Sequence, residues 1–247
     1  MSRYDFRTPR LFVACDLAPG ALVPLDKGQV NYLLNVLRLD VGDAVLAFNG
    51  RDGEWRTRLQ REGRKDSALA VVAQTRPQTD ACDLHYLFAP LKHARLDYMV
   101  QKAVELGVSR LQPVTTRHTQ VARVNLDRMR ANAIEAAEQC GILTIAEVCE
   151  TMPLIMALDR LTAGRAVIFC DENAEIREPV AALSHIPKGT PLAVLIGPEG
   201  GFAEEERTLL LQHPAVTRLA LGPRILRADT AAVAALSLVQ AVVGDWS

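Results

Sequence analysis

The stretch Leu221-Gly-Pro-Arg-Ile-Leu-Arg-Ala-Asp-Thr-Ala231 joins a short apolar run to an Ala- and Val-rich segment that predicts a helix at 230–243. Such a stretch is typical of a loop that leaves a buried strand and enters a helix. Large apolar side chains such as Ile225 and Leu226 are rarely placed in loops unless something buries them. A flat apolar ligand and another part of the chain are both open as that partner.

A second loop, Ile196-Gly-Pro-Glu-Gly-Gly-Phe202, follows a buried-strand pattern at 192–196 and precedes a helical pattern at 203–212. Its three glycines remove Cβ atoms where the backbone turns sharply or approaches a ligand. Pro198 restricts the turn further. Loops between strands and helices commonly contain glycines, so this pattern alone favours a ligand site no more than an ordinary connection.

These loops belong to a longer alternation of strand and helix patterns. Strands are predicted at 84–89, 110–115, 166–170, 192–196 and 219–221, and helices at 94–106, 125–140, 203–212 and 230–243. Strands that alternate with helices predict an α/β fold with a parallel sheet. Residues 76–247 are therefore expected to form one α/β domain.

The region before residue 76 has a different pattern. Its predicted strands are closely spaced, at 10–15, 43–48, 54–61 and 69–73, and a short helix is predicted at 29–37. Several short strands at close spacing predict a small β-barrel. Residues 76–80 have the polar, Pro-containing composition of a linker. The sequence thus predicts two domains, 1–75 and 76–247.

Composition and charge narrow the class of protein. With 49% hydrophobic residues in 247, the chain can bury a core without disulfides or metal ions. The balance of 28 Lys and Arg against 29 Asp and Glu excludes a uniformly basic nucleic-acid binder. Residues 1–130, however, carry 20 basic and 14 acidic side chains, whereas the remainder carries 8 and 15. This asymmetry favours an anionic partner for the first half, with a chance distribution as the alternative.

Several other functions are disfavoured by missing motifs. No apolar run approaches the ~20 residues of a membrane span, and the polar start predicts no export signal, so a cytoplasmic protein is expected. The five cysteines show no CxxC spacing and the five histidines no HExxH, so no metal site is expected. A GxGxxG fingerprint, a Walker A loop and a GxSxG elbow are all missing from the sequence. Any nucleotide-like cofactor must therefore be held in another way.

Taken together, the two loops resemble the paired motifs of the RsmE family in the SPOUT superfamily. The similarity extends over nearly the whole chain and is carried in order by these further segments: Arg7-Thr-Pro-Arg-Leu-Phe-Val13, Val36-Leu-Arg-Leu39, Gly42-Asp43, Asn49-Gly50, Lys92, Gln101-Lys-Ala-Val-Glu-Leu-Gly-Val108 and Glu135-Ala-Ala-Glu-Gln139. Each segment alone is a weak signal. Their order and spacing together are specific.

The resemblance implies a fold and an activity. The expected fold is a trefoil-knotted α/β SPOUT methyltransferase domain, preceded by a small PUA-like β-barrel that binds RNA. Members of the family use S-adenosylmethionine to methylate N3 of a specific uridine in 16S ribosomal RNA of the small subunit. They act as homodimers, so a homodimer is expected here as well.

The resemblance also implies which residues form the site. The cofactor is expected to contact backbone groups and apolar side chains of the two loops: Ile196, Gly197, Pro198, Glu199, Gly200, Gly201, Leu221, Gly222, Ile225, Leu226, Thr230 and Ala231. Arg227 is the candidate for stabilising negative charge on the uracil oxygens. Glu199 is a candidate for positioning or for accepting the N3 proton. Alternatively, its carboxylate only braces the loop.

The RNA is expected to contact the basic first half of the chain. Seven residues are candidates for phosphate contacts: Arg7, Arg10, Arg38, Arg51, Lys92, Arg95 and Lys102. Arg95 and Lys102 are seven residues apart, so a helix presents them on one face. Each of these side chains is equally well explained as an ordinary solvated charge.

Five residues, at four places in the sequence, depart from the family pattern. Ile142 replaces an expected Arg, Thr116-Arg-His118 replaces a Glu-Arg-Ser sequence, Ala203 replaces a Ser or Thr cap, and Asp229 replaces a Glu. These changes leave two alternatives open. One is a non-catalytic RNA-binding factor for ribosome assembly on the same scaffold. The other is a SPOUT enzyme that acts on another RNA, such as tRNA.

Overall fold

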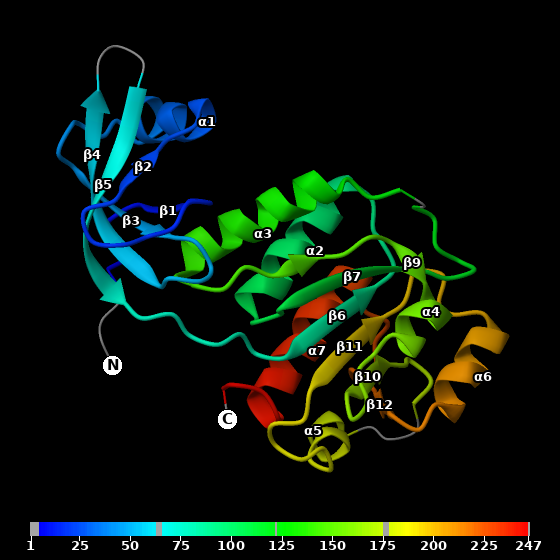
Figure 1. The fold of residues 1–247 in the computed structure, drawn as a ribbon. Coiled ribbons are helices and arrows are strands. Elements are labelled where there is room, and N and C mark those ends of the chain that lie inside the picture. Colours follow the sequence, from blue (N-terminus) through cyan, green and yellow to red (C-terminus); the bar gives the residue numbers. More distant parts are fainter. Residues whose placement is uncertain (1–4, 63–65, 122, 175–177, 247) are drawn as a thin grey trace. The chain divides into compact units, whose positions relative to one another are not determined.

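The structure is a computed structural model that describes residues 5–62, 66–121, 123–174 and 178–246 (Figure 1). The chain forms two compact units. The first comprises Met1–Asp80 and Ala137–Ile145, and the second comprises Ala81–Ala136 and Ala146–Ser247. A single boundary between residues 75 and 76 does not describe this division, because the segment 137–145 packs with the first unit.

The first unit is built on a mixed five-stranded sheet. Its strands are β1 (Arg10–Phe12), β2 (Leu22–Pro24), β3 (Ala44–Phe48), β4 (Glu54–Glu62) and β5 (Asp66–Arg76). They lie in the order β1-β3-β4-β5-β2, and β1 pairs with β3 in parallel while the other pairs are antiparallel. Along β4, Trp55, Thr57 and Leu59 are buried and the residues between them are exposed, as the sequence pattern predicts. This buried face joins the apolar core of the unit.

The helical segment of the first unit starts earlier than predicted. Instead of one helix at 29–37, the structure has α1 (Lys27–Val30) followed by a π-helical turn, η1 (Asn31–Val36). Asp26 Oδ1 accepts from the Gln29 N–H at 2.8 Å, and Gln29 Oε1 accepts from the Asp26 N–H at 3.0 Å. This capping box satisfies backbone donors and sets the start of the helix before its first apolar residue.

The second unit contains a parallel sheet with helices. Its elements are β6 (Leu84–Phe88), α2 (His93–Glu105), β7 (Arg110–Thr115), α3 (Leu126–Cys140), β8 (Glu147–Val148), β9 (Met152–Pro153), α4 (Leu154–Asp159), β10 (Ala166–Cys170), α5 (Pro179–Leu183), β11 (Leu192–Ile196), α6 (Glu204–Gln212), β12 (Val216–Leu219) and α7 (Ala228–Val242). The strand order is β12-β10-β11-β6-β7-β8, and β9 also pairs with β7. Every recorded pair is parallel, which confirms the predicted α/β class.

One strand prediction in this unit is wrong. The strand expected at 219–221 is β12 at Val216–Leu219, and it lies at one edge of the sheet. An edge strand has one partner, so polar residues such as Thr217 and Arg218 are tolerated within it. A rule based on continuous apolar runs therefore finds only its last residue. The predicted knot stays a prediction, because strand order alone does not describe how the chain threads.

The chain changes direction across the sheet at β6. From β6 it proceeds to β7 on one side, and it later returns to place β11 on the other side. The helices that follow such strands diverge, and ligands of open α/β sheets bind at the carboxyl ends of the strands at this kind of switch point. The fold thus indicates where a site belongs. In the described part of the chain, no helix is both long and apolar enough to span a membrane.

Candidate active site at the carboxyl edge of the parallel sheet

The two glycine-containing loops lie at one edge of the parallel sheet. The loop 197–203 follows β11, and the loop 220–227 follows β12. Strand β10 lies between these two strands and is parallel to both. The carboxyl ends of all three strands therefore meet at the same edge, and the two loops that carry the expected cofactor contacts both start there.

Glycine is required at different positions of these loops for different structural reasons. Gly201 and Gly222 have φ angles of 70° and 96°, which residues with a Cβ rarely adopt. Gly197 instead has no positive φ, but a Cβ there would lie 2.4 Å from the ring of Phe202. That ring packs edge-on against Phe169 of β10, with centroids 5.2 Å apart. The absence of a side chain at Gly197 thus serves internal packing, whereas Gly201 permits a left-handed turn.

The loop after β12 presents an apolar surface to solvent. Ile225 is 93% exposed, and Leu221 and Leu226 are half-buried. Covering a large aliphatic side chain yields roughly 1.5–3 kcal/mol. Backbone groups held by left-handed glycines beside exposed aliphatic side chains fit an adenine ring, which has an apolar face and polar edges. The residues present therefore fit a nucleoside-containing cofactor.

One arginine connects the loop after β11 to the first turn of α7, which directly follows the loop after β12. Arg95, in the first turn of α2, donates from Nε to Asp229 Oδ2 at 3.0 Å and from Nη2 to Asp229 Oδ1 at 3.2 Å. Its Nη1 donates to the Glu199 carboxylate. The hydrogen bond from Arg95 holds the pKa of Asp229 below its ordinary value. Glu199 is thus engaged by a guanidinium, which favours the positioning role over the proton-accepting role considered from the sequence.

Arg227 occupies the residue before α7. Its backbone is extended, its carbonyl accepts from the Ala231 N–H at 2.8 Å, and its side chain is exposed. The helix therefore begins at Ala228, and Asp229 and Thr230 both lie inside its first turn. This position leaves the Arg227 guanidinium at the edge of the site.

The start of α6 explains one departure from the family pattern. Ala203 has no capping side chain, but Glu206 reaches back and accepts from the Ala203 N–H at 3.0 Å. The other oxygen of Glu206 accepts from the Arg117 N–H at 2.8 Å. His118 Nδ1 lies 3.1 Å from the Gly201 carbonyl oxygen. His118 thus contacts the glycine loop directly, and the Arg117 backbone contacts the first turn of α6 that follows this loop.

Sequence reasoning missed Asp171 at this edge. Its side chain is 1% exposed and accepts from Arg207 at 3.0 Å and from Arg218 at 2.8 Å. Asp171 directly follows β10, between the strands that carry the two loops. An acidic residue immediately after a buried apolar run at 166–170 was a signal that could have found it.

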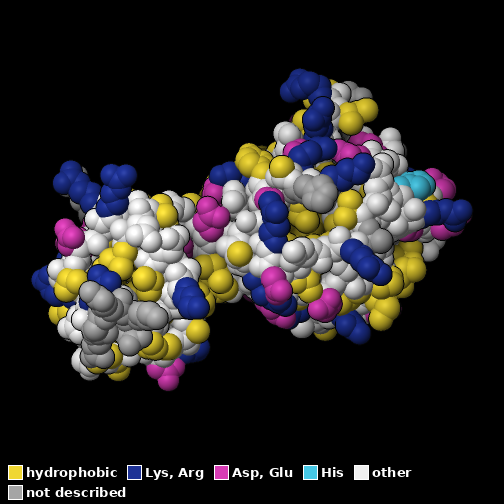
Figure 2. All heavy atoms as spheres, turned by 90° about the horizontal axis from the view of Figure 1, so that it is seen from above, with side chains coloured by type: hydrophobic (Ala, Val, Ile, Leu, Met, Phe, Trp, Pro, Cys, Tyr) yellow, Lys and Arg dark blue, Asp and Glu magenta, His cyan; other side chains and the backbone are white. Residues whose placement is uncertain are grey.

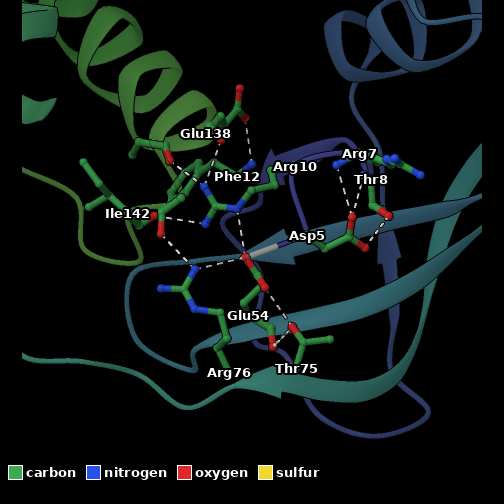
Figure 3. A network of polar contacts seen from close by, with 12 residues as sticks. Asp5, Arg7, Thr8, Arg10, Phe12, Glu54, Thr75, Arg76, Glu138 and Ile142 are labelled. Carbon is green, nitrogen blue, oxygen red and sulfur yellow. Dashed lines mark hydrogen bonds and ion pairs between the residues drawn. The ribbon is translucent and has the colours of Figure 1, made fainter. Parts of the chain in front are cut away.

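Arg10 is not available as an RNA contact, which corrects the sequence expectation. Its side chain is 9% exposed and pairs with Glu54 at 2.8 Å, and it donates to the carbonyl oxygens of Glu138 and Ile142 at 2.9 and 3.1 Å (Figure 3). Arg76 also donates to Glu54, at 3.5 Å, and to the Gly141 carbonyl at 2.8 Å. Burial lowers the pKa of Arg10, and the hydrogen bond to Glu54 opposes that effect.

The other proposed RNA contacts are in varied settings. Arg7, Arg38 and Lys92 are exposed. Arg51 pairs with Asp16 at 2.7 Å, and Lys102 pairs with Glu105 at 2.7 Å. On the face drawn in Figure 2, Lys and Arg side chains are spread among hydrophobic and acidic ones. Arg95, by contrast, is already engaged with two carboxylates of the loops.

Ile142, which replaces an arginine of the family pattern, is partly buried. It packs in a small apolar cluster that also contains Phe48, Ala137 and Leu143. Its carbonyl oxygen accepts from Arg10 Nη2 at 3.1 Å. This position therefore contributes packing and a backbone acceptor to the first unit.

The chain is thus an α/β protein with a parallel sheet, and the two glycine-containing loops at the carboxyl edge of that sheet fit a nucleotide-like cofactor. Residues 78–240 match the family model described as "RNA methyltransferase domain", and residues 25–72 match the "RNA methyltransferase PUA domain". The chain belongs to this family of RNA methyltransferases, which confirms its resemblance to the RsmE proteins.

Individual relatives are similar over almost their whole length. Ribosomal RNA small subunit methyltransferase E of Rickettsia conorii is 28% identical over 94% of both chains. The Bacillus subtilis protein of the same name is 29% identical over 85% of this chain and 86% of that protein. The crystal structure of the Neisseria gonorrhoeae protein of that name, bound to S-adenosylmethionine, has a TM-score of 0.84 and 27% identity and covers 98% of this chain and 100% of that one.

Proposed function

We propose that this chain transfers the methyl group of S-adenosylmethionine to N3 of a specific uridine in the 16S ribosomal RNA of the small subunit. One observation carries the proposal. In a chain of the RNA methyltransferase family, the two glycine-containing loops meet at one edge of the parallel sheet. The names of the relatives supply the RNA class.

The cofactor is held by the loops after β11 and β12. We assign its backbone contacts to residues 196–201 and 221–222, and its apolar contacts to Leu221, Ile225 and Leu226. Thr230 and Ala231 lie in the first turn of α7, which follows the second of these loops. S-adenosylmethionine supplies an electrophilic methyl group on a sulfonium centre. Because that group reacts by in-line displacement, the main tasks of the protein are alignment and exclusion of water.

Arg227 and Glu199 act on different parts of the site. Attack by uracil N3 requires loss of its imide proton, so negative charge develops on the neighbouring carbonyl oxygens. The exposed guanidinium of Arg227 is suited to stabilising that charge through hydrogen bonds. Glu199 positions its loop through Arg95.

The two domains predicted from the sequence, residues 1–75 and 76–247, both contact the RNA. Phosphate contacts are assigned to five of the original candidates: Arg7, Arg38, Arg51, Lys92 and Lys102. The uridine is taken out of its stack, since N3 is otherwise enclosed by pairing. The protein works as a homodimer in the cytoplasm.

The test is a methylation assay with isotope-labelled S-adenosylmethionine and small ribosomal subunits that lack the modification. After digestion, mass spectrometry identifies the labelled nucleoside. We expect label in N3-methyluridine from one site. Parallel reactions contain naked 16S RNA and tRNA. Binding of cofactor and subunit without transfer would contradict the proposal and favour a non-catalytic assembly factor, whereas label only in tRNA would identify another substrate.

A further inference from the structure

Arg95 joins three segments that follow three different strands. It lies in α2, which follows β6, whereas Glu199 follows β11 and Asp229 lies in α7, after β12. The guanidinium uses Nε and Nη2 on Asp229 and Nη1 on Glu199. These contacts span 104 residues of sequence to Glu199 and 134 to Asp229.

The backbone of the sheet does not tie the two loops to each other. Strands β11 and β12 are separated by β10, so no ladder of hydrogen bonds runs directly between them. Arg95 makes one planar connection between the carboxylates of Glu199, in the loop after β11, and Asp229, in the first turn of α7 after the second loop. A bidentate arginine–carboxylate pair fixes orientation as well as distance, and a lysine cannot reproduce it because its ammonium is a point charge.

The net charge of Arg95, Glu199 and Asp229 together argues against a phosphate contact at Arg95. One guanidinium faces two carboxylates, which leaves the trio with a net charge of −1. The side chain of Arg95 is 31% exposed, and its three assigned donor atoms already have acceptors. Three of the five guanidinium N–H donors are used by the carboxylates, and a phosphate that approached the other two would meet the net negative charge of the trio.

We infer that Arg95 is a positioning residue that holds the two loops in the arrangement that binds S-adenosylmethionine, rather than an RNA contact. The inference rests on the proposed function. Ion pairs as exposed as this one contribute little to global stability. Their effect on a binding site is larger, because loops held in the binding arrangement lose less conformational entropy when a ligand binds.

The experiment compares Arg95→Ala and Arg95→Lys with a matched control, Arg128→Ala. Arg128 also makes a bidentate pair with a carboxylate, Asp97 of α2, at 2.9 and 2.5 Å, but it does not contact either loop. Calorimetry measures the dissociation constant for S-adenosylmethionine. Filter binding measures RNA affinity and its dependence on salt, and thermal unfolding measures stability.

We expect Arg95→Ala to weaken S-adenosylmethionine binding about tenfold, equivalent to about 1.4 kcal/mol. Arg95→Lys is expected to recover only part of this loss. RNA affinity and its salt slope should match those of the wild type, and the thermal shift should match that of Arg128→Ala. Because Asp229 is the main partner, Asp229→Asn should add little to the loss in an Arg95→Ala background.

Unchanged cofactor affinity in Arg95→Ala would overturn the inference and leave the proposed function standing. A reduced salt slope for RNA with unchanged cofactor affinity would return Arg95 to the RNA contacts. If Arg95→Ala does not fold, Arg95→Lys and Asp229→Asn provide the same comparison. A wild-type protein that binds no S-adenosylmethionine would overturn the proposed function itself, and this inference with it.

Discussion

The molecule contains two arginine–carboxylate networks with similar chemistry and different surroundings. In the first unit, Arg10 and Arg76 share Glu54, whose side chain is 5% exposed. In the second unit, Arg95 is shared by Glu199 and Asp229, and the Glu199 side chain is 45% exposed. The first network has two cations on one anion, and the second has one cation on two anions.

Burial determines what each network does. Arg10 and Arg76 donate to the carbonyl oxygens of Ala137, Glu138, Gly141 and Ile142, at and just beyond the last turn of α3 (Figure 3). Removing one member would leave charges buried without compensation. The members of the Arg95 network remain accessible to water, so the same removal there should alter the loops and leave the fold intact.

The largest effect is expected from Glu54→Gln, which breaks the buried network. Both arginines would keep their charge and lose their carboxylate, so the free energy of unfolding should fall by about 3–5 kcal/mol. Urea denaturation measures this loss. The control is Asp16→Asn, which removes the partner of Arg51 from a pair whose side chains are 57% and 93% exposed. If both variants lose equal stability, burial does not distinguish the networks.

The next effect should appear in catalysis alone. Arg227→Ala removes an exposed guanidinium next to the Arg95 network, so kcat should fall about 10²–10³-fold if that group stabilises developing charge. Neither the unfolding midpoint nor the affinity for S-adenosylmethionine should change appreciably. Arg224→Ala, an exposed arginine of the same loop, is the matched control for kcat measured on small subunits. An equal loss of kcat in both variants would contradict the assignment.

The sequence predicts the buried parts of the sheet best. Strands β10 and β11 have the predicted bounds, because a strand buried on both faces is a continuous apolar run. Strand β7 also has the predicted bounds, although it contains Arg110, Gln112 and Pro113. The prediction fails at β12, which is an edge strand, and at β2, which has only three residues and ends in Pro24. These strands depend on pairing with distant segments, which local patterns do not contain.

The features of the candidate site also divide into those that local sequence patterns predict and those that depend on contacts with distant segments. Glycine patterns locate both loops, because a left-handed turn such as that at Gly222 selects for glycine locally. They do not show that Gly197 is required by Phe202, or that Arg95 pairs with Asp229. Arg10 and Arg95 were both expected to contact RNA, because a sequence records a charge but not the carboxylate that it meets in the fold.

A smaller effect should come from replacing either of two glycines with left-handed backbone, which lie at opposite ends of strands in the same sheet. Gly222 follows β12, Gly164 precedes β10, and their φ angles are 96° and 84°. No atom lies within 4 Å of a Cβ built at either position, so alanine adds backbone strain without a clash. Each substitution should cost about 1–2 kcal/mol of unfolding free energy.

Only Gly222→Ala should also weaken S-adenosylmethionine binding, because its loop is one of the two held by Arg95. Calorimetry on the two variants measures this difference. We expect a loss of about fivefold for Gly222→Ala and none for Gly164→Ala, a free-energy difference of about 1 kcal/mol. Equal affinity in the two variants would remove this loop from the cofactor site.

The smallest effect concerns the titration of Asp229. Its pKa lies below the ordinary value of 3.8 because Arg95 donates to its carboxylate. A depressed pKa in the folded state means that the pair stabilises the fold fully above the unfolded pKa and loses this contribution as pH falls through the folded value. Between pH 5 and 8 this pair should therefore leave both stability and cofactor affinity independent of pH.

Carboxyl-carbon NMR measures the midpoint for Asp229 directly. In Arg95→Ala the midpoint should rise toward the ordinary value, while the contribution to stability, about 1 kcal/mol or less for so accessible a pair, should disappear. An unchanged midpoint would mean that the ion pair is not populated in solution. Arg95 of α2 would then not hold the loops after β11 and β12. The two networks would differ because the buried one forms its ion pairs in solution and the accessible one does not.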